Sequence, residues 1–407
     1  GLGYLKRTAR VSGGMHRPGY VYEDDYAGVN GLEKVFNSQL QGQNGAARVV
    51  TDEAGFCESI QILSPATTGL TVRTTIQLPI QKIVEQSLRS QRAAAAVLLD
   101  VHSGDVIAMA SCPGFDPNRF IPMLSSTYWQ SLSQDKHTPF LSRVDRGRQP
   151  PGSIFKVITS LAAMRAGVFD PDRVLDCDGT YQVAGFAFKF PEETKSVNYR
   201  DALATSCNSY FIDLGIKSGQ EAIARTAREF GVGEKTGFIL PGESEGRMPD
   251  PAFMQTTHHR DLNEIDLANI SIGQGDVLVT PLQAANWMAA LANGGTLYKP
   301  RLVSGLENEQ GLVATNFPTT LLRKIDLPLE REFLKKALVE VVEDGTGSAA
   351  HVRGVRIAAK TGTAQVGAKG RPRQIAWING YMPAQEPRYA FAIMLEGDFD
   401  QDLHGGT

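Results

Sequence analysis

Three short groups of residues stand in order along the chain and could together carry out acyl transfer. Ser153 and Lys156 are separated by one helical turn's spacing, Ser206 and Asn208 follow, and Lys360 comes last. A serine hydroxyl can attack a carbonyl when a neighbouring group removes its proton. In this set of residue types the base is an amine rather than an imidazole. The sequence therefore predicts a serine acyl-transfer site that uses lysine as its base.

Each of these short patterns occurs a second time, so the flanking residues must distinguish the copies. The second copies are Ser133 with Lys136, Ser196 with Asn198, and the Lys-Thr-Gly at residues 235–237. Matches this short are hypotheses that need the right structural context. We interpret Ser133 as part of a solvated loop, Asn198 as a helix-capping residue and Lys235 as part of a surface turn.

The stretch that begins at Ser153 is predicted to be a buried helix. It follows Pro150, Pro151 and Gly152 and continues as a mainly apolar run that stops before Gly167. Proline and glycine are typical of helix starts and ends. Residues three apart share one face of a helix, so the amine of the lysine can reach the serine hydroxyl.

Lys360 is predicted to lie on a strand with two antiparallel neighbours, at 375–381 and 389–395. Such a strand can line a cleft beside a helix. Ser206 and Asn208 lie in an apolar, helix-periodic setting, and two interpretations of them stay open. They take part in the chemistry, or they only cap backbone groups at a helix junction.

The elements around these residues predict an α+β fold in two parts. Residues 1–90 are polar and rich in turns, and we expect an extended non-catalytic module there. Residues 91–407 begin with a hairpin at 95–110 and end with the three strands near Lys360. Strands at both ends with helices between them predict an antiparallel sheet flanked by helices. The intervening helices are expected near 220–230, 281–293 and 329–342.

Composition argues against several classes of function. Lys and Arg total 41 against 44 Asp and Glu, without long charged blocks, so nucleic acid is not expected as a partner. The histidines and cysteines show no zinc-binding spacing, so we expect neither a metal nor another cofactor. The redox state of the cysteines stays open. These are Cys57, Cys112, Cys177 and Cys207.

The sequence also lacks the marks of a membrane segment. No apolar run approaches the roughly 18 residues that a membrane span needs. The chain begins without methionine and without a signal-peptide pattern. We therefore expect it to be an excised part of a longer protein.

With these motifs in place, the chain resembles the class B penicillin-binding proteins, the monofunctional D,D-transpeptidases that cross-link peptidoglycan. The resemblance runs nearly end to end. It rests on residues 31–33, Gly42 with Gly45, 116–118, 150–156, Ser206 with Asn208, and 360–365. The segments at 272–275 and 280–283 are most similar to the elongation-type branch, homologous to penicillin-binding protein 2.

The resemblance implies a penicillin-binding/serine β-lactamase-like transpeptidase domain at 91–407, preceded by a pedestal or linker module at 1–90. It also implies a C-terminal helix on the sheet and an upstream transmembrane anchor, both missing from this chain, and a location on the extracytoplasmic face of the bacterial membrane. The implied ligands are peptidoglycan stem peptides and β-lactams. Residues 1–90 would contact membrane proteins of cell-wall synthesis, a glycosyltransferase and a scaffold.

For a stem peptide ending in D-Ala-D-Ala, the resemblance assigns a role to each reacting group. Ser153 attacks the penultimate carbonyl, and Lys156 removes its proton as a neutral amine. Lys360 supplies a second positive charge, and Ser206 relays a proton to the departing D-alanine.

A second set of residues binds the substrate. Asn208 holds the backbone of the donor peptide, and the hydroxyls of Thr361 and Thr363, which flank Gly362, bind the terminal carboxylate. The backbone N–H groups of Ser153 and Thr363 form the oxyanion hole.

The sequence departs from the family pattern at two places, and alternative functions have to be considered. Gln77 replaces the aspartate usual in its segment, and residues 142–144 replace the usual Asn-Arg-Ala, so contacts there stay open. A class A β-lactamase would need a Glu-x-x-Leu-Asn segment, which is absent from the sequence. A D,D-carboxypeptidase stays open, as does a non-catalytic sensor or scaffold that only binds β-lactams.

Overall fold

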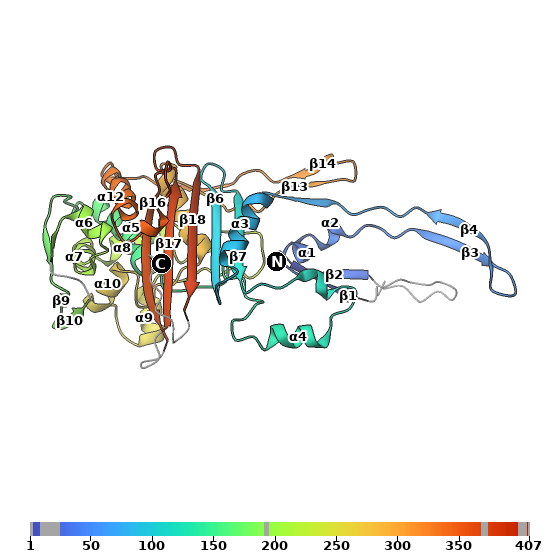
Figure 1. Cartoon of the computed structure of the whole chain (residues 1–407), viewed down its shortest axis with the longest axis horizontal. Coiled ribbons are helices and arrows are strands. Elements are labelled where there is room, and N and C mark those ends of the chain that lie inside the picture. The colour runs from blue at the N-terminus through green and yellow to red at the C-terminus, as the bar shows by residue number, and fades with distance from the viewer. Residues whose placement is uncertain (1–2, 9–24, 191–194, 368–372, 398–404, 406–407) are drawn as a thin grey trace.

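A five-stranded antiparallel sheet organises the larger part of the protein (Figure 1). Its strands run in the order β16, β17, β18, β6 and β7. Because β18 pairs with β6, distant parts of the sequence close one sheet, which confirms the predicted α+β class. The strand bounds are Ala94–Asp100 (β6), Val106–Cys112 (β7), Ala358–Val366 (β16), Arg373–Met382 (β17) and Tyr389–Glu396 (β18).

Most of the described helices lie between β7 and β16. The protein's structure is a computed structural model that describes residues 3–8, 25–190, 195–367, 373–397 and 405. All three helices expected in this stretch are present, as α8, α11 and α12. The helices from α3 onward are Leu78–Leu88 (α3), Ser126–Ser133 (α4), Lys156–Arg165 (α5), Tyr199–Ala204 (α6), Asn208–Ser218 (α7), Gln220–Glu229 (α8), Pro251–His258 (α9), Glu264–Ser271 (α10), Pro281–Ala292 (α11) and Arg331–Glu343 (α12).

Different helices cover the two faces of the sheet. On β6, Ala95 and Val97 point into the main core, where α11 packs against β6 and β18. Ala94 and Ala96 point the other way and pack with Leu88 of α3. This alternation follows from the two-residue period of a strand. Every residue of α11 is buried, in keeping with a helix that is apolar except for Gln283 and Asn286.

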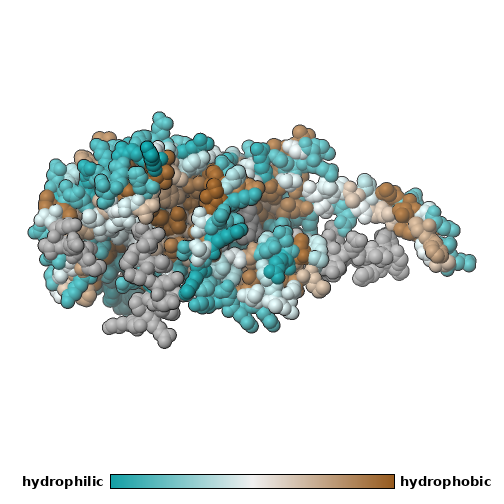
Figure 2. Space-filling model, viewed as in Figure 1, coloured by the Kyte–Doolittle hydropathy of each residue, from teal (hydrophilic) through white to brown (hydrophobic). Residues whose placement is uncertain are grey.

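Part of the outer face of the sheet carries apolar side chains that are only half-buried. Ile378 of β17 and Phe391 and Ile393 of β18 lie there. Figure 1 shows this face between α12 and α3, and Figure 2 shows apolar surface at the same place. Ile378 and Phe391 pack beside Val342 of α12, and Ile393 packs beside Leu88 of α3.

The N-terminal module extends away from the sheet. Its β3 and β4 form a long hairpin that projects from the body (Figure 1). Its last strand, β5, pairs with β13 of the larger part. The elements of the module are Gly3–Thr8 (β1), Asp25–Asn30 (β2), Gly31–Val35 (α1), Asn37–Leu40 (α2), Ala46–Thr51 (β3), Cys57–Ser64 (β4) and Thr71–Thr74 (β5).

In the part of the chain that the structure describes, eight further short strands lie outside the main sheet. Those between α5 and α6 form two small two-stranded sheets, in which β8 pairs with β11 and β9 with β10. The bounds are Leu175–Cys177 (β8), Thr180–Val183 (β9), Phe186–Lys189 (β10), Lys195–Val197 (β11), Thr296–Tyr298 (β12), Val303–Glu307 (β13), Val313–Asn316 (β14) and Leu321–Lys324 (β15).

The described helices are all short. The longest, α12, has 13 residues, whereas a helix needs about 20 apolar residues to cross a bilayer. No helix in the described ranges combines the length and apolar character of a membrane span.

Candidate active site

The segment that carries Ser153 begins as a tighter turn than predicted. A 3-10 helix, η2, spans Gly152–Phe155, and the α-helix α5 starts only at Lys156. In a 3-10 turn the side chains at i and i+3 eclipse one another. Ser153 and Lys156, the residue that follows this 3-10 helix, are therefore expected on one face of the turn. Lys156 is fully buried, and Ser153 is partly exposed.

Strand β16 passes directly against the start of η2. A Cβ atom on Gly152 would lie 2.6 Å from the carbonyl oxygen of Thr363. A Cβ atom on Gly362 would lie 2.8 Å from the carbonyl oxygen of Pro151. Glycine at both positions is what permits this close approach. The contact places the backbone of Thr363 beside Gly152, the residue before Ser153.

Lys156 joins two of the predicted groups. Its Nζ donates to the carbonyl oxygen of Ser206 at 2.7 Å and to Oδ1 of Asn208 at 2.7 Å, and Oγ of Ser206 lies 3.2 Å away. The ring of Phe211 lies 5.2 Å from the same nitrogen. The N-cap of α7 is Cys207, so neither Ser206 nor Asn208 caps this helix. Their contacts with Lys156 therefore favour the interpretation that they take part in the chemistry.

Ser206 adopts a backbone conformation that is unusual for a residue with a side chain. Its φ is 61°, in the left-handed region that favours glycine. Such residues typically cost about 1–3 kcal/mol and persist where their surroundings hold them. Here Lys156 binds the carbonyl of Ser206, and the N–H of Cys207 donates to Ala202 at 2.8 Å.

A disulfide joins Cys207, the middle residue of this motif, to Cys177 of β8. The sequence left the redox state of both open. Cys207 Sγ also accepts a hydrogen bond from the N–H of Tyr210 at 3.4 Å and so caps α7. Cys57 and Cys112 are free.

Lys360 is fully buried on β16, and burial lowers its pKa to about 7. Its Nζ donates to the carbonyl of Thr361 at 2.9 Å. The hydroxyl of Thr361 lies 2.6 Å from that of Thr346, whose N–H donates to Ala204 at 3.1 Å. Thr346 therefore links the strand to the turn before Ser206, a connection that the sequence did not reveal.

Thr363 also has contacts that the sequence did not predict. Its hydroxyl accepts a hydrogen bond from the N–H of Gly405 at 3.2 Å, so its own proton can still be donated. The Gln274 amide donates to the carbonyl of Thr363 at 3.3 Å. The N–H of Gly152 donates to Gly273 at 2.9 Å. Residues 272–275, noted earlier only for the resemblance, thus support both sides of the site.

The hydroxyl of Ser153 has no hydrogen-bond partner among the described residues, and Lys156 donates to the Ser206 turn. Catalytic hydrogen bonds are often long before substrate binds and tighten in the complex. Next to this turn, a cavity of about 550 Å³ is lined by residues of β11, α6 and α12. None of the predicted site residues lines this cavity.

The second copies of the motifs lie elsewhere. Asn198 caps α6 by accepting from the N–H of Asp201, as predicted. Ser133 is exposed, but it ends helix α4 and is not part of a loop, which corrects our interpretation. Lys235 is exposed in the irregular segment that follows the turn at 231–233, and the carboxylate of Glu243 accepts from Thr236 and the next two N–H groups.

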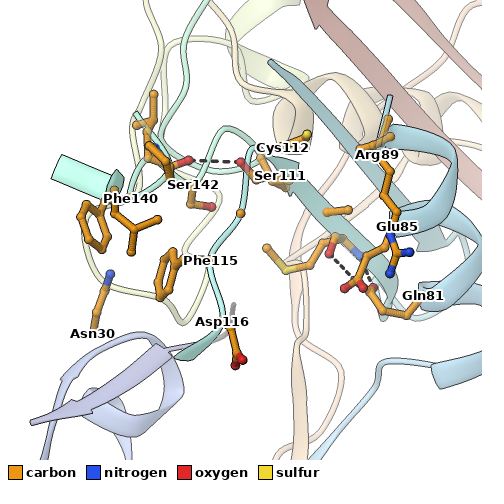
Figure 3. A pocket seen from close by; sticks show the side chains of 18 of the residues that line it. Asn30, Gln81, Glu85, Arg89, Ser111, Cys112, Phe115, Asp116, Phe140 and Ser142 are labelled. Atoms are coloured by element: carbon orange, nitrogen blue, oxygen red, sulfur yellow. Dashed lines mark hydrogen bonds between the residues drawn. The ribbon is translucent and has the colours of Figure 1, made fainter. Parts of the chain in front are cut away.

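A larger cavity of about 900 Å³ lies away from these residues, between the N-terminal module, α3, β7 and the loop before η2 (Figure 3). Gln81, Glu85 and Arg89 line one side, and Phe115 and Phe140 line the other. Its one thiol is a weak nucleophile, because burial raises the pKa of Cys112. We therefore do not place the chemistry there.

Comparison with known proteins decides the family. Residues 94–405 match the profile of the penicillin binding protein transpeptidase domain. The chain belongs to this transpeptidase family. Residues 2–74 match the penicillin-binding protein dimerisation domain. The fold described above is therefore the penicillin-binding transpeptidase fold with its N-terminal companion.

Three named relatives are similar to most of this chain. Peptidoglycan D,D-transpeptidase MrdA of Acinetobacter baumannii is 29% identical over 95% of this chain and 60% of MrdA, so the chain spans about three fifths of that relative. The complex of PBP2 and MreC from Helicobacter pylori has a TM-score of 0.77 and 27% identity, over 91% of this chain and 68% of that one. The penicillin G acyl-enzyme complex of M. tuberculosis penicillin-binding protein A gives 0.72 and 30%, over 84% and 78%.

Proposed function

We propose that this chain is a peptidoglycan D,D-transpeptidase that joins stem peptides through an acyl-enzyme on Ser153. The observation that carries the proposal is the convergence on Lys156. Its amine lies one 3-10 turn after Ser153 and within 3.2 Å of Ser206 Oγ and Asn208 Oδ1. Strand β16 closes the other side of this cluster.

The proposed reaction begins with attack by Ser153 Oγ on the carbonyl of the penultimate D-alanine. Lys156 accepts the hydroxyl proton, which requires that its amine is neutral at this step. The developing oxyanion is held by the backbone N–H groups of Ser153 and Thr363. One such donor is typically worth about 2.7–4 kcal/mol of barrier. Ser206 passes a proton to the departing D-alanine, and an amine of a second stem peptide then attacks the acyl-enzyme.

The proposed binding groups follow the strand. Lys360, Thr361 and Thr363 attract and bind the terminal carboxylate of the donor, and Gly362 keeps the strand close to η2. Asn208 holds the donor backbone while its Oδ1 accepts from Lys156. A β-lactam carries a similar carboxylate beside its reactive carbonyl, so it would acylate the same serine and remain attached.

One experiment separates this function from its rivals. The protein is incubated with a pentapeptide donor and an amine acceptor, and separately with penicillin, and both reactions are followed by mass spectrometry. Cross-linked product and a penicillin adduct that persists for hours support a transpeptidase. Release of D-alanine alone indicates a carboxypeptidase, and rapid hydrolysis of penicillin indicates a β-lactamase. An adduct without turnover of any peptide indicates a sensor.

We also propose that the chain works in cell elongation, on the extracytoplasmic side of the membrane, held by an anchor upstream of residue 1. The similarity to MrdA supports the elongation role. The disulfide supports the location, because disulfides persist in oxidising compartments outside the cytoplasm.

The β3–β4 hairpin is the proposed docking surface for a cell-wall synthesis partner, a scaffold of the MreC type or a glycosyltransferase. Val49 pairs with Ile60, and Ile62 lies two residues further along the same face. Ile60 is 64% exposed and Ile62 is 72% exposed. Exposed apolar stripes of this kind mark interaction sites.

Ile60→Glu combined with Ile62→Glu is expected to weaken capture of the partner at least tenfold, because two charges would enter an apolar contact. Pull-down of a co-expressed MreC-type scaffold measures the effect. Gln61→Glu places a charge on the opposite face of the same strand and serves as the control. Equal losses with both variants would contradict the assignment. Acylation by penicillin is expected to stay unchanged.

Because Lys360 loses its charge as pH rises, the rate of acylation is expected to fall with it. Because burial lowers the pKa of Lys360 to about 7, its amine is protonated below that pH and neutral above it. An anionic β-lactam binds the protonated form, so the rate of acylation is expected to fall up to about tenfold per pH unit above pH 7. Stopped-flow labelling with penicillin G between pH 6 and 9 measures this.

Two controls test whether Lys360 and the carboxylate cause this limb. The methyl ester of penicillin lacks the carboxylate and should lose the falling limb. Lys235→Ala, in the exposed second copy of the motif, should leave the profile as in the wild type. A rate that is flat or rises for penicillin G across this range would refute the role.

A further inference from the structure

The disulfide lies at an unusual place for a structural cross-link. Cys207 stands between Ser206 and Asn208, whose oxygens both accept from Lys156. Its partner, Cys177, belongs to β8, outside the main sheet. Both sulfur-bearing residues are buried, with at most 3% of their surface exposed.

The segment that contains Cys177 is attached to α7 by a second, independent set of contacts. The guanidinium of Arg173 forms an ion pair with Asp213 of α7. The hydroxyl of Tyr181 donates to the same carboxylate at 3.0 Å, and Tyr210 donates to the carbonyl of Arg173 at 3.4 Å. These contacts hold the segment in place whether or not the disulfide is present. The disulfide therefore acts chiefly on the residue at its other end, Cys207.

The turn at Cys207 contains a residue in an unusual backbone conformation and two acceptors of the Lys156 amine. Ser206 sits in the left-handed region, where the backbone has no intrinsic preference to stay. The Lys156 amine must reach the carbonyl of Ser206 and the amide of Asn208 at once, both at 2.7 Å. A small rotation of the turn would separate these two acceptors. A covalent bond from the middle residue to a separately anchored strand opposes that rotation.

We propose that the disulfide makes Cys207 a positioning residue, which fixes Ser206 and Asn208 on Lys156, so that the rate of acylation depends on the oxidised state of this pair. The inference rests on the proposed function of Ser153 and Lys156. Reduction by a dithiol breaks the S–S bond and transfers two electrons and two protons to the pair. Cys177 and Cys207 become thiols, and the dithiol becomes a cyclic disulfide.

The test compares the oxidised wild type, the wild type reduced with dithiothreitol, and Cys177→Ala, which removes the bond without changing the motif. Stopped-flow kinetics with penicillin separate the acylation rate constant from the non-covalent dissociation constant. The acylation rate constant is expected to fall about tenfold to a hundredfold in both altered forms, because small displacements of catalytic groups have effects of this size. The dissociation constant is expected to change less than twofold. Reoxidation of the reduced wild type should restore the rate.

Matched controls distinguish positioning from general loosening. Arg173→Ala removes one ion pair of the segment but leaves the disulfide and the hydrogen bond of Tyr181 to Asp213 intact, so its acylation rate constant should fall much less than that of Cys177→Ala. Cys57→Ala and Cys112→Ala remove the free thiols and should respond to dithiothreitol as the wild type does. Alkylation followed by mass spectrometry counts the thiols and confirms that the bond was reduced.

Two results would overturn the inference. One is a wild-type acylation rate constant in reduced protein and in Cys177→Ala, with only the melting temperature lowered, which would make the disulfide a stabilising cross-link alone. The other is an equal fall of the rate constant in Arg173→Ala. Absence of any penicillin adduct on the oxidised wild type is a separate outcome, which would refute the proposed function and with it this inference.

Discussion

Ser153→Ala is expected to abolish covalent labelling by a fluorescent penicillin. No other hydroxyl in the described cluster stands one turn before the buried amine of Lys156 with the backbone of Thr363 beside it. Loss of a serine nucleophile typically lowers turnover about 10⁶-fold, and only the binding contribution remains. The substitution removes one oxygen from a partly exposed side chain that has no hydrogen-bond partner among the described residues. The fold should therefore stay as it is.

The matched control for this prediction is Ser133→Ala, in the second copy of the motif. Ser133 is exposed at the end of α4, so this variant should label as the wild type does. Gel fluorescence after labelling gives the first readout, and mass spectrometry of the modified peptide gives the second. A Ser153→Ala protein that still carries the label, or a label on another serine, would refute the nucleophile assignment.

The sheet could be predicted from the sequence because the patterns that indicate its strands and its turn involve only neighbouring residues. The continuous apolar runs of β6 and β18 and the turn at residues 102–104 are each recognised from neighbouring residues. The same holds for the choice between the two Lys-Thr-Gly copies, since a strand and a glycine-rich turn differ in their immediate flanks. For the approach of β16 to η2, the sequence predicted only a strand that can line a cleft beside a helix; in the structure, Gly362 and Gly152 stand where a side chain would collide.

Other parts of the site depend on contacts between distant residues, which local patterns cannot reveal. Four cysteines allow six pairs, and only the fold brings Cys177 to Cys207. Thr346 follows α12 in what looks like an ordinary glycine-containing turn, yet it reaches Thr361. The start of the nucleophile segment as a 3-10 turn was also missed, because the flanking Pro and Gly indicate a helix start without specifying its type.

Lys156→Met is expected to lower the rate of acylation by about 10²–10⁴-fold, the usual contribution of a general base. Its effect on stability should be much smaller. The substitution leaves the carbonyl of Ser206 and the amide of Asn208 without their donor, which costs free energy. It also removes the desolvation penalty of a fully buried amine, and methionine fills a similar volume, so the two effects oppose one another.

This combination of a large kinetic loss with a small thermal shift is what separates a base from a packing residue. Stopped-flow labelling measures the first quantity and thermal melting the second. Lys136→Met, at the exposed end of the other Ser-x-x-Lys, should change neither. If Lys156→Met acylates within tenfold of the wild-type rate, another group takes the proton from Ser153. The proposal that the disulfide positions Ser206 and Asn208 on this amine would then lose its basis as well, since the two acceptors would be fixed around a residue that the reaction does not need.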